Sequence, residues 1–219
     1  MNHATDGLLV RLVSFSAAFA ANPSLRVDYE GFTVWLNCQE HAVFQFRYNA
    51  QRDSGNFPRS SAFRLDPAVP YACQPSSANS FKTNVSGALT YERGHQVPAN
   101  HLDYSALAIR QSNYMTNILP QTATLDRGAW LRTEEIIECY RDQTELLVLG
   151  GALWGNTKAA RKNDYFVGSH NIPTPESFWK VVIAGDGSTM VWLIPNDQTA
   201  TTGKLDRFLS KTAQLALKT

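Results

Sequence analysis

The sequence lacks a long apolar run, a strong net charge and any internal repeat. No segment reaches the roughly 18 uninterrupted apolar residues that a membrane-spanning helix needs, so we expect a soluble protein with no membrane partner. The formal net charge is only +1, and attraction to a polyanion would have to come from a local cluster of Lys and Arg. Without repeats, the 219 residues fit a single globular domain, which we place at residues 25–219.

Cysteine is scarce as well. The three cysteines, Cys38, Cys73 and Cys139, do not have the spacing of a metal site, and their odd number allows at most one intramolecular disulfide. The sequence leaves two interpretations open, one disulfide or buried thiols, and we favour the thiols.

Residues 1–24 form an N-terminal segment of different composition. Residues 8–20 are mostly apolar and run into the small residues of 17–21, as in a signal peptide before its cleavage site. Asp6 and Arg11 argue against that interpretation, and an amphipathic helix packed on the domain is the alternative. We favour a secreted or periplasmic location, and a mitochondrial one stays open for a eukaryotic source.

A β-rich region is followed by a long polar one. Residues 27–48 are rich in β-branched and aromatic residues around a short polar break, which predicts a pair of strands. Residues 51–80 are dense in Ser, Pro, Asn and Asp, which predicts an irregular surface loop with a brief interruption near 63–65. Loops of this length usually serve a site.

The second half of the sequence mixes helical and extended patterns. Residues 129–141 have a helical pattern that Asp126 could cap, and Trp130 and Tyr140 are expected in the core. Residues 204–217 predict a last amphipathic helix. Three short apolar runs predict strands of a central sheet: 146–153, 178–184 and 190–194. Strands, then a helix, then strands again favour an α+β fold over a regular βαβ alternation.

The residues best suited to chemistry lie between positions 91 and 141. Hydrolysis of a phosphodiester needs a base to activate water, a cation to neutralise charge at phosphorus, and help for the departing oxygen. His95 suits the base, because an imidazole with a pKa of about 6.5 can accept a proton at neutral pH. Arg93, two residues away, could grip a phosphate through two N–H groups.

Asp126 and Glu134 are candidates for holding a divalent cation. Asp126 offers a hard oxygen to Mg²⁺, which commonly takes one or two protein ligands and keeps several waters. Glu134, two helical turns further on, could hold one of those waters by a hydrogen bond. The plainer alternatives are that Asp126 is only a helix cap and that Glu134 belongs to a solvated helix face. We favour the metal site.

The order of these residues resembles a known family. The segments that carry the resemblance read Tyr-Glu-Arg-Gly-His (91–95), Asn-Ile-Leu-Pro-Gln (117–121) and Leu-Asp-Arg-Gly-Ala-Trp (125–130), and Glu134 follows on the predicted helix. They are similar to the Asp-Arg-Gly-His, Asn-Ile-x-Pro-Gln and Leu-Asn-x-Gly-x-Trp pattern of the DNA/RNA non-specific endonucleases, which belong to the ββα-metal or His-Me finger class. Weaker similarities at 31–34 and 163–167 extend the resemblance over most of the chain.

The resemblance implies a ββα-metal fold with a central, mainly antiparallel sheet and flanking helices. It also implies an endonuclease that hydrolyses DNA and RNA through their phosphate backbones, leaves 5′-phosphate ends, and uses Mg²⁺, with Mn²⁺ or another divalent cation open. The implied roles are His95 as general base, Asp126 as direct metal ligand, Glu134 as the residue that orients metal-bound water, Asn117 as a residue that fixes the site, and Arg93 as the phosphate-binding residue.

Three positions are less certain within this pattern. The family's second arginine is placed at Arg59, with Arg64 as a rival because the loop aligns loosely. The family's leading Asp is Glu92, a change that we expect to be tolerated because that carboxylate is not assigned the chemistry. The metal-binding Asn is Asp126, whose extra charge cancels part of the cation's field at the phosphate and leaves the metal preference open.

Two functions other than that of an endonuclease stay open, and the other four histidines are not expected to be the base. A nucleic-acid-binding protein that keeps the fold but has lost turnover is one alternative, and an enzyme for smaller phosphodiesters is another. A homodimer and an inhibitor protein stay open. We expect His3, His41 and His170 to be structural or exposed, and His101 to be a neighbour of the site and not its base.

Overall fold

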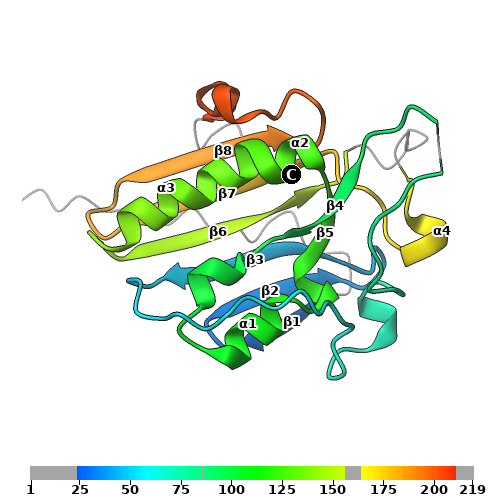
Figure 1. The fold of residues 1–219 in the computed structure, drawn as a ribbon, viewed down its shortest axis with the longest axis horizontal. Helices are drawn as coiled ribbons and strands as arrows, with labels where there is room; N and C mark the ends of the chain where they lie inside the picture. Colours follow the sequence, from blue (N-terminus) through cyan, green and yellow to red (C-terminus); the bar gives the residue numbers. More distant parts are fainter. Residues whose placement is uncertain (1–23, 85, 156–163, 211–219) are drawn as a thin grey trace, which may run out of the picture.

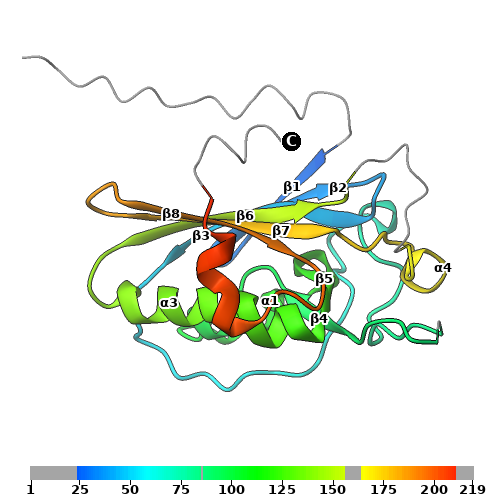
Figure 2. The same cartoon turned by 90° about the horizontal axis from the view of Figure 1, so that it is seen from above.

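The computed structural model describes residues 24–84, 86–155 and 164–210. Its centre is a six-stranded antiparallel sheet with the strand order β1-β2-β3-β6-β7-β8, and a second, two-stranded sheet pairs β4 with β5. Figure 2 shows the large sheet edge-on, with α1, α3 and the β4–β5 hairpin on one side of it. This architecture confirms the prediction of an α+β fold with a central antiparallel sheet.

The first three strands come from the region predicted as a pair. They are β1 (Ser24–Tyr29), β2 (Phe32–Asn37) and β3 (Ala42–Ala50). The prediction of two strands was wrong, because Gly31 adopts a φ of +86° and turns the chain between β1 and β2. Glycine reaches this left-handed region without the steric cost that a Cβ brings.

The three apolar runs in the second half form the strands predicted for them. β6 (Leu146–Leu153), β7 (Ser177–Ala184) and β8 (Thr189–Pro195) pair in sequence order (Figure 1). Every second side chain in the first part of β7 is buried, which is the period of a strand with one face on the core. These runs were predictable because their ends coincide with turn residues.

Strand β5 (Ile118–Thr122) leads directly into the helix that carries the metal candidates. The helix has three parts, α2 (Ala123–Leu125), a π-helical turn η4 (Asp126–Trp130) and α3 (Leu131–Arg141). The Thr122 hydroxyl accepts a hydrogen bond from the Leu125 N–H at 3.2 Å and caps the helix. The cap prediction for Asp126 was therefore wrong, since Asp126 lies within the helix with φ −57° and ψ −47°.

Gly128 creates the π-helical turn. Its φ of −112° and ψ of −108° are not helical, and a Cβ at this position would lie 2.7 Å from the carbonyl oxygen of Ala200. The Ala129 N–H donates to that same oxygen at 3.0 Å. The segment after β8 thus takes up the N–H that the distorted turn leaves free, and such turns are frequent at functional sites.

The core positions of α3 agree only in part with the prediction. Trp130 is buried, as expected, but Tyr140 is 48% exposed. The buried positions along α3 are Thr133, Ile137 and Arg141, which are four residues apart and lie on one face of the helix. Arg141 therefore faces the core at the end of α3, and its neighbour Tyr140 faces away from it.

Residues 51–80 form the long irregular loop that the sequence predicts. The described elements within it are a short 3₁₀ helix, η1 (Tyr71–Cys73), and an isolated bridge between Arg64 and Tyr114. That bridge confirms the predicted interruption near 63–65.

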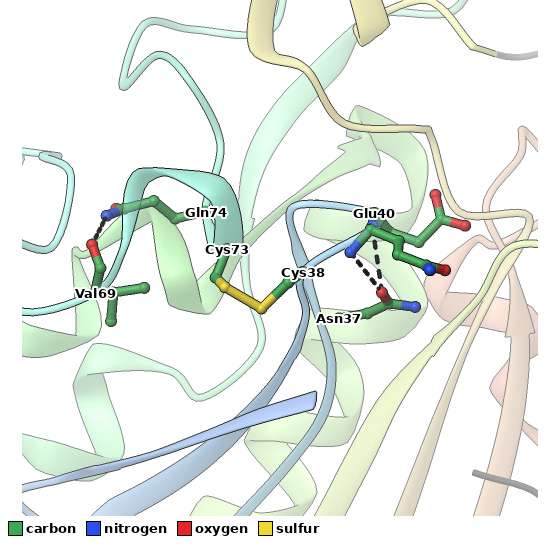
Figure 3. The surroundings of a disulfide bond; sticks show 7 residues. Asn37, Cys38, Glu40, Val69, Cys73 and Gln74 are labelled. Atoms are coloured by element: carbon green, nitrogen blue, oxygen red, sulfur yellow. Dashed lines mark hydrogen bonds between the residues drawn. A yellow bond between two sulfur atoms is a disulfide. The ribbon is translucent and has the colours of Figure 1, made fainter. Parts of the chain in front are cut away.

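A disulfide joins this loop to the large sheet. Cys38, in the turn between β2 and β3, is bonded to Cys73 (Figure 3), so the prediction of buried thiols was wrong for this pair. Cys139 is free and exposed. The two bonded cysteines are 35 positions apart, and sequence spacing alone does not reveal that the fold brings them together.

The remaining described helices are short. They are η2 (Ala99–Leu102), α1 (Ala106–Ser112), η3 (Met115–Asn117), α4 (Val167–His170) and η5 (Thr202–Phe208). No helix in the described part of the chain is long and apolar enough to cross a membrane.

The predicted helix at 204–217 is confirmed in part, because residues 204–208 are helical, but the helix is a 3₁₀ helix and ends at Phe208. After the 3₁₀ helix η5, Leu209 forms a bridge with Trp192, and the Ser210 N–H donates to the Val191 carbonyl at 2.9 Å. Pairing with the edge strand β8 thus replaces helical hydrogen bonds. The rest of that prediction, and residues 1–23 of the expected N-terminal segment, lie outside the described residues.

Candidate active site

The paired strands β4 and β5 meet the start of the α2–α3 helix (Figure 1), and these elements carry the candidates Arg93, His95, Asp126 and Glu134. Arg93 and His95 are two residues apart on β4 (Tyr91–His95) and therefore lie on the same face of that strand. Between them, a Cβ on Gly94 would overlap the Gln121 side chain. The Trp130 indole N–H donates to the His95 carbonyl oxygen at 3.0 Å, which fixes the helix against the end of β4.

The His95 imidazole is oriented by Asn113. Its Nε2 lies 2.9 Å from Asn113 Oδ1, while the Asn113 side-chain nitrogen donates to the Ser60 carbonyl oxygen at 2.8 Å. Because a carbonyl oxygen can only accept, the second bond fixes the orientation of the amide. His95 Nε2 must then be the donor, and Nδ1 is the nitrogen left free to accept a proton.

The His95 imidazole is neutral near pH 7. Burial lowers its pKa, the charges of Arg59 and Arg93 lower it as well, the hydrogen bond to Asn113 raises it, and the resulting pKa is about 4. The environment thus keeps Nδ1 unprotonated over the whole neutral range.

Arg93 is held by the long loop. Its guanidinium lies over the Phe63 ring, 3.8 Å from the ring centroid, and donates to the Ala78 carbonyl oxygen at 3.0 Å. The same Phe63 ring lies 5.4 Å from the His95 ring, centroid to centroid. One aromatic side chain therefore contacts both the proposed base and the proposed phosphate-binding arginine.

Arg59 is the loop arginine whose charge reaches the site. It lowers the pKa of both His95 and Glu134, and its side chain is exposed on the loop. Arg64 instead pairs its backbone with Asn113 and Met115. These charge effects support Arg59, and the choice between Arg59 and Arg64 stays a prediction.

Asn117 binds the chain that directly follows His95. Its fully buried amide accepts from the Val97 N–H at 3.0 Å and donates to the carbonyl oxygens of Val97 and Ser112, each at 2.9 Å. The backbone carbonyl oxygen of Asn117 accepts a hydrogen bond from the Gln96 N–H at 2.9 Å. Asn117 therefore ties the chain after His95 to the end of α1.

Asp126 faces other carboxylates. Burial raises its pKa, a hydrogen bond with Glu92 and the charges of Glu92 and Glu134 raise it as well, and the resulting pKa is about 8. Glu92 is also bound by Arg127, whose Nε donates to Glu92 Oε2 at 3.0 Å and whose terminal nitrogen donates to Oε1. The carboxylate expected to be a bystander thus contacts the proposed metal ligand directly.

Glu134 lies in the first part of α3. Burial raises the pKa of its carboxyl group, whereas the positive charges of Lys180, His101 and Arg59 lower it. Since Glu134 also raises the pKa of Asp126, the two carboxylates share one region of the site.

The donors at this site fit a hard divalent cation. Among the described residues there is no cluster of three or more His, Cys, Asp or Glu that would enclose a metal. The mutual repulsion that raises the pKa of Asp126 is what a cation at its carboxylate would relieve.

The other histidines behave as expected where they are described. His101 is buried between the Tyr48 hydroxyl at 2.8 Å and Glu138 at 3.1 Å, close enough to the site to affect Glu134. His170 is buried and bonded to the Asn79 carbonyl oxygen, while His41 accepts from an asparagine amide. His3 lies outside the described residues.

Asn113, Phe63 and the effect of Glu92 on Asp126 were not predicted from the sequence. Asn113 sits four residues before Asn117 in a segment already singled out, so its amide was a visible candidate. No local pattern marks Phe63, because its role depends on the loop folding back over β4.

The sequence matches a known protein family. The family model of the DNA/RNA non-specific endonucleases matches residues 14–216. The chain is 28% identical over 146 residues to the nuclease of Serratia marcescens, covering 62% of this chain and 49% of that protein. It is 28% identical over 133 residues to the mitochondrial nuclease EXOG of Mus musculus, covering 56% and 33%. Human mitochondrial endonuclease G is 26% identical over 128 residues, covering 54% and 43%.

The fold is also found among solved structures. One chain of a crystal structure of the EndoG/EndoGI complex aligns with a TM-score of 0.71 and 16% identity, covering 88% of this chain and 82% of that one. The chain spans less than half the length of the three curated relatives above. Because the family model covers nearly the whole sequence, this chain belongs to the DNA/RNA non-specific endonuclease family, with its ββα-metal fold.

Proposed function

We propose that this protein is a divalent-metal-dependent endonuclease that hydrolyses the phosphodiester bonds of DNA and RNA and leaves 5′-phosphate ends. Family membership supports the reaction class. The observation that carries the mechanism is the orientation of His95, whose Nε2 is engaged by Asn113 while Nδ1 stays free and neutral.

His95 is the general base in this mechanism. Its Nδ1 takes a proton from the attacking water, and the resulting imidazolium keeps its Nε2–H bonded to Asn113. Asn113 acts through His95 as a positioning residue, since it fixes which nitrogen is free. Asn117 positions the same strand end through the backbone of Gln96 and Val97.

Asp126 would hold Mg²⁺ directly, with Mn²⁺ or another divalent cation as an alternative. The bound cation supplies positive charge that stabilises the transition state and the departing oxygen. Glu134 accepts hydrogen bonds from water beside Asp126 and so orients that water. Arg127 binds Glu92 and so offsets part of the negative charge beside Asp126.

Arg93 and Arg59 bind the phosphate. Arg93 uses one nitrogen for the Ala78 carbonyl oxygen, which leaves its other N–H groups for a phosphate oxygen. A site built this way contacts the nucleic-acid backbone, so base selectivity is expected to be weak and affinity to fall steeply with salt.

Cleavage of plasmid DNA and of a structured RNA tests the proposal. We expect both to be cut in Mg²⁺, neither in EDTA, and a loss of about 10²–10⁴-fold in rate for His95→Ala. Ligation of the products without prior phosphorylation would report 5′-phosphate ends. Binding without cleavage over a range of divalent metals would instead favour a nucleic-acid-binding protein, and cleavage of a chromogenic diester alone would favour a small-substrate enzyme.

A further inference from the structure

A lysine lies in the core of the protein beneath the site. Lys180, on β7, is 0% exposed and stands in register with Gly150 on β6 and Trp192 on β8. Its side chain points to the face of the sheet that α3 covers, because its nitrogen contacts α3. Lysine is rarely fully buried unless it is paired, so this position needs an explanation.

The Lys180 ammonium binds the start of α3. Its Nζ donates to Thr133 Oγ1 at 2.7 Å, and the Thr133 hydroxyl in turn donates to the Trp130 carbonyl oxygen at 2.7 Å. Nζ also lies 3.6 Å from the centroid of the Trp130 ring. Since the indole N–H of Trp130 binds the His95 carbonyl oxygen, Lys180 is connected to the end of β4 through two contacts.

The charge of Lys180 is matched by Glu134. Burial lowers the pKa of Lys180 to about 8, and the charge of Glu134 raises it. Lys180 is also the foremost of the cations that lower the pKa of Glu134 against the effect of burial; His101 and Arg59 are the others, and Glu135 opposes them. No direct ion pair joins Lys180 to Glu134 in the described structure. The two charges therefore interact at longer range, with Lys180 bound to Thr133, the residue next to Glu134.

We propose that Lys180 is a positioning residue for the nuclease site: its buried ammonium is the counter-charge of Glu134, and its contacts with Thr133 and Trp130 fix the first turn of α3. The inference rests on the proposed function, because Glu134 needs a counter-charge only if it must stay anionic to orient water. It explains why a cation, and not an apolar side chain, occupies a core position of β7.

A double-mutant cycle in thermal stability tests this coupling without any metal or substrate. Lys180→Met and Glu134→Gln each leave one charge without its counter-charge, whereas the double variant removes both. We expect the fall in Tm of the double variant to be clearly smaller than the sum of the two single falls. The exposed Lys82 provides the matched control, and the effects of Lys82→Met and Glu134→Gln should add. Additive effects for Lys180 and Glu134 would overturn the proposal.

A second measurement covers the case in which Lys180→Met does not fold. The pKa of Lys180, followed by NMR of lysine labelled with ¹³C at Cε, is expected to be lower in Glu134→Gln than in the wild type. An unchanged pKa would contradict the proposal.

Kinetics then connect the pair to catalysis. Lys180→Met should lower kcat about tenfold or more with little change in KM, and its effect should be smaller in the Glu134→Gln background than in the wild type, because one of its two roles is already lost there. An equal loss in both backgrounds would count against the proposal. Absence of cleavage by the wild type would refute the proposed function, while the melting and NMR experiments would still decide whether Lys180 and Glu134 are coupled.

Discussion

The hydrogen bond between Asn113 and His95 offers the sharpest test of the mechanism. Asn113→Asp keeps an oxygen 2.9 Å from His95 Nε2 but makes it anionic. A carboxylate at this distance stabilises the imidazolium, and an opposite charge this close typically shifts a pKa by about 1–3 units. Since the pKa of His95 is about 4 in the wild type, we expect about 5–7 in the variant.

The sign of the effect on activity follows from the role of His95 as a base. Only the neutral imidazole can accept a proton, so activity is lost as pH falls through the His95 pKa. The acid limb of kcat/KM should therefore move upward by about 1–3 pH units in Asn113→Asp, equivalent to about 1.4–4 kcal/mol of added interaction with the charged imidazolium. The substitution also loses the donor to Ser60, so a modest fall in the plateau rate is expected.

The assay is cleavage of a chromogenic thymidine diester, or of plasmid, at saturating Mg²⁺ between about pH 4 and 8, with circular dichroism to verify folding at each pH. Asp126 also titrates, but both proteins carry it unchanged, so the difference between the profiles reports His95. Asn113→Leu, which removes the acceptor, serves as the matched control and should not raise the limb. Coinciding acid limbs for the wild type and Asn113→Asp would refute the assignment of Nδ1 as the base.

Three further predictions concern the metal ligand, the disulfide and the aromatic contact. Protonation of Asp126, with a pKa of about 8, competes with Mg²⁺ binding. Mg²⁺ affinity measured by calorimetry should therefore rise with pH up to about 8 in the wild type but not in Asp126→Asn. We expect the Asp126→Asn variant to cleave DNA with a shifted metal preference. Reduction of the Cys38–Cys73 disulfide, or Cys38→Ser with Cys73→Ser, should lower the free energy of unfolding in urea by about 3–4 kcal/mol, since it frees a loop with a sequence separation of 35; an unchanged midpoint would contradict this. Phe63→Leu should raise KM about 2- to 30-fold through loss of the cation–π contact with Arg93, and equal effects of Phe63→Tyr and Phe63→Leu would show that only volume matters.

The local environment of Asp126 explains how an acidic residue can stand where the family pattern has asparagine. Arg127 is 74% exposed and holds Glu92, which in turn bonds to Asp126. Arg127, next to Asp126, offsets part of the negative charge of that carboxylate. Because the Arg127 side chain is exposed to solvent, water and salt screen this attraction and make it weaker. The tolerance of Glu92 stays a prediction, in which Arg127 is the residue that binds its carboxylate.

The sequence by itself determined the features that depend on local pattern. The three strands β6, β7 and β8 were predictable because apolar runs end at turn residues, and the candidates His95, Asp126 and Glu134 were predictable because their residue types and order match a nuclease motif.

Only the tertiary structure decided the contacts made across long stretches of chain. The disulfide, the stacking of Phe63 on Arg93 and the bond from Asn113 to His95 each join segments that no periodicity relates. The helix boundary at Asp126 also depended on tertiary contact, because the backbone at Ala200 supports the π-helical turn. Local propensity sets where a strand or helix can form, but the position of a catalytic proton depends on side chains that meet only after the sheet and the loop have packed together.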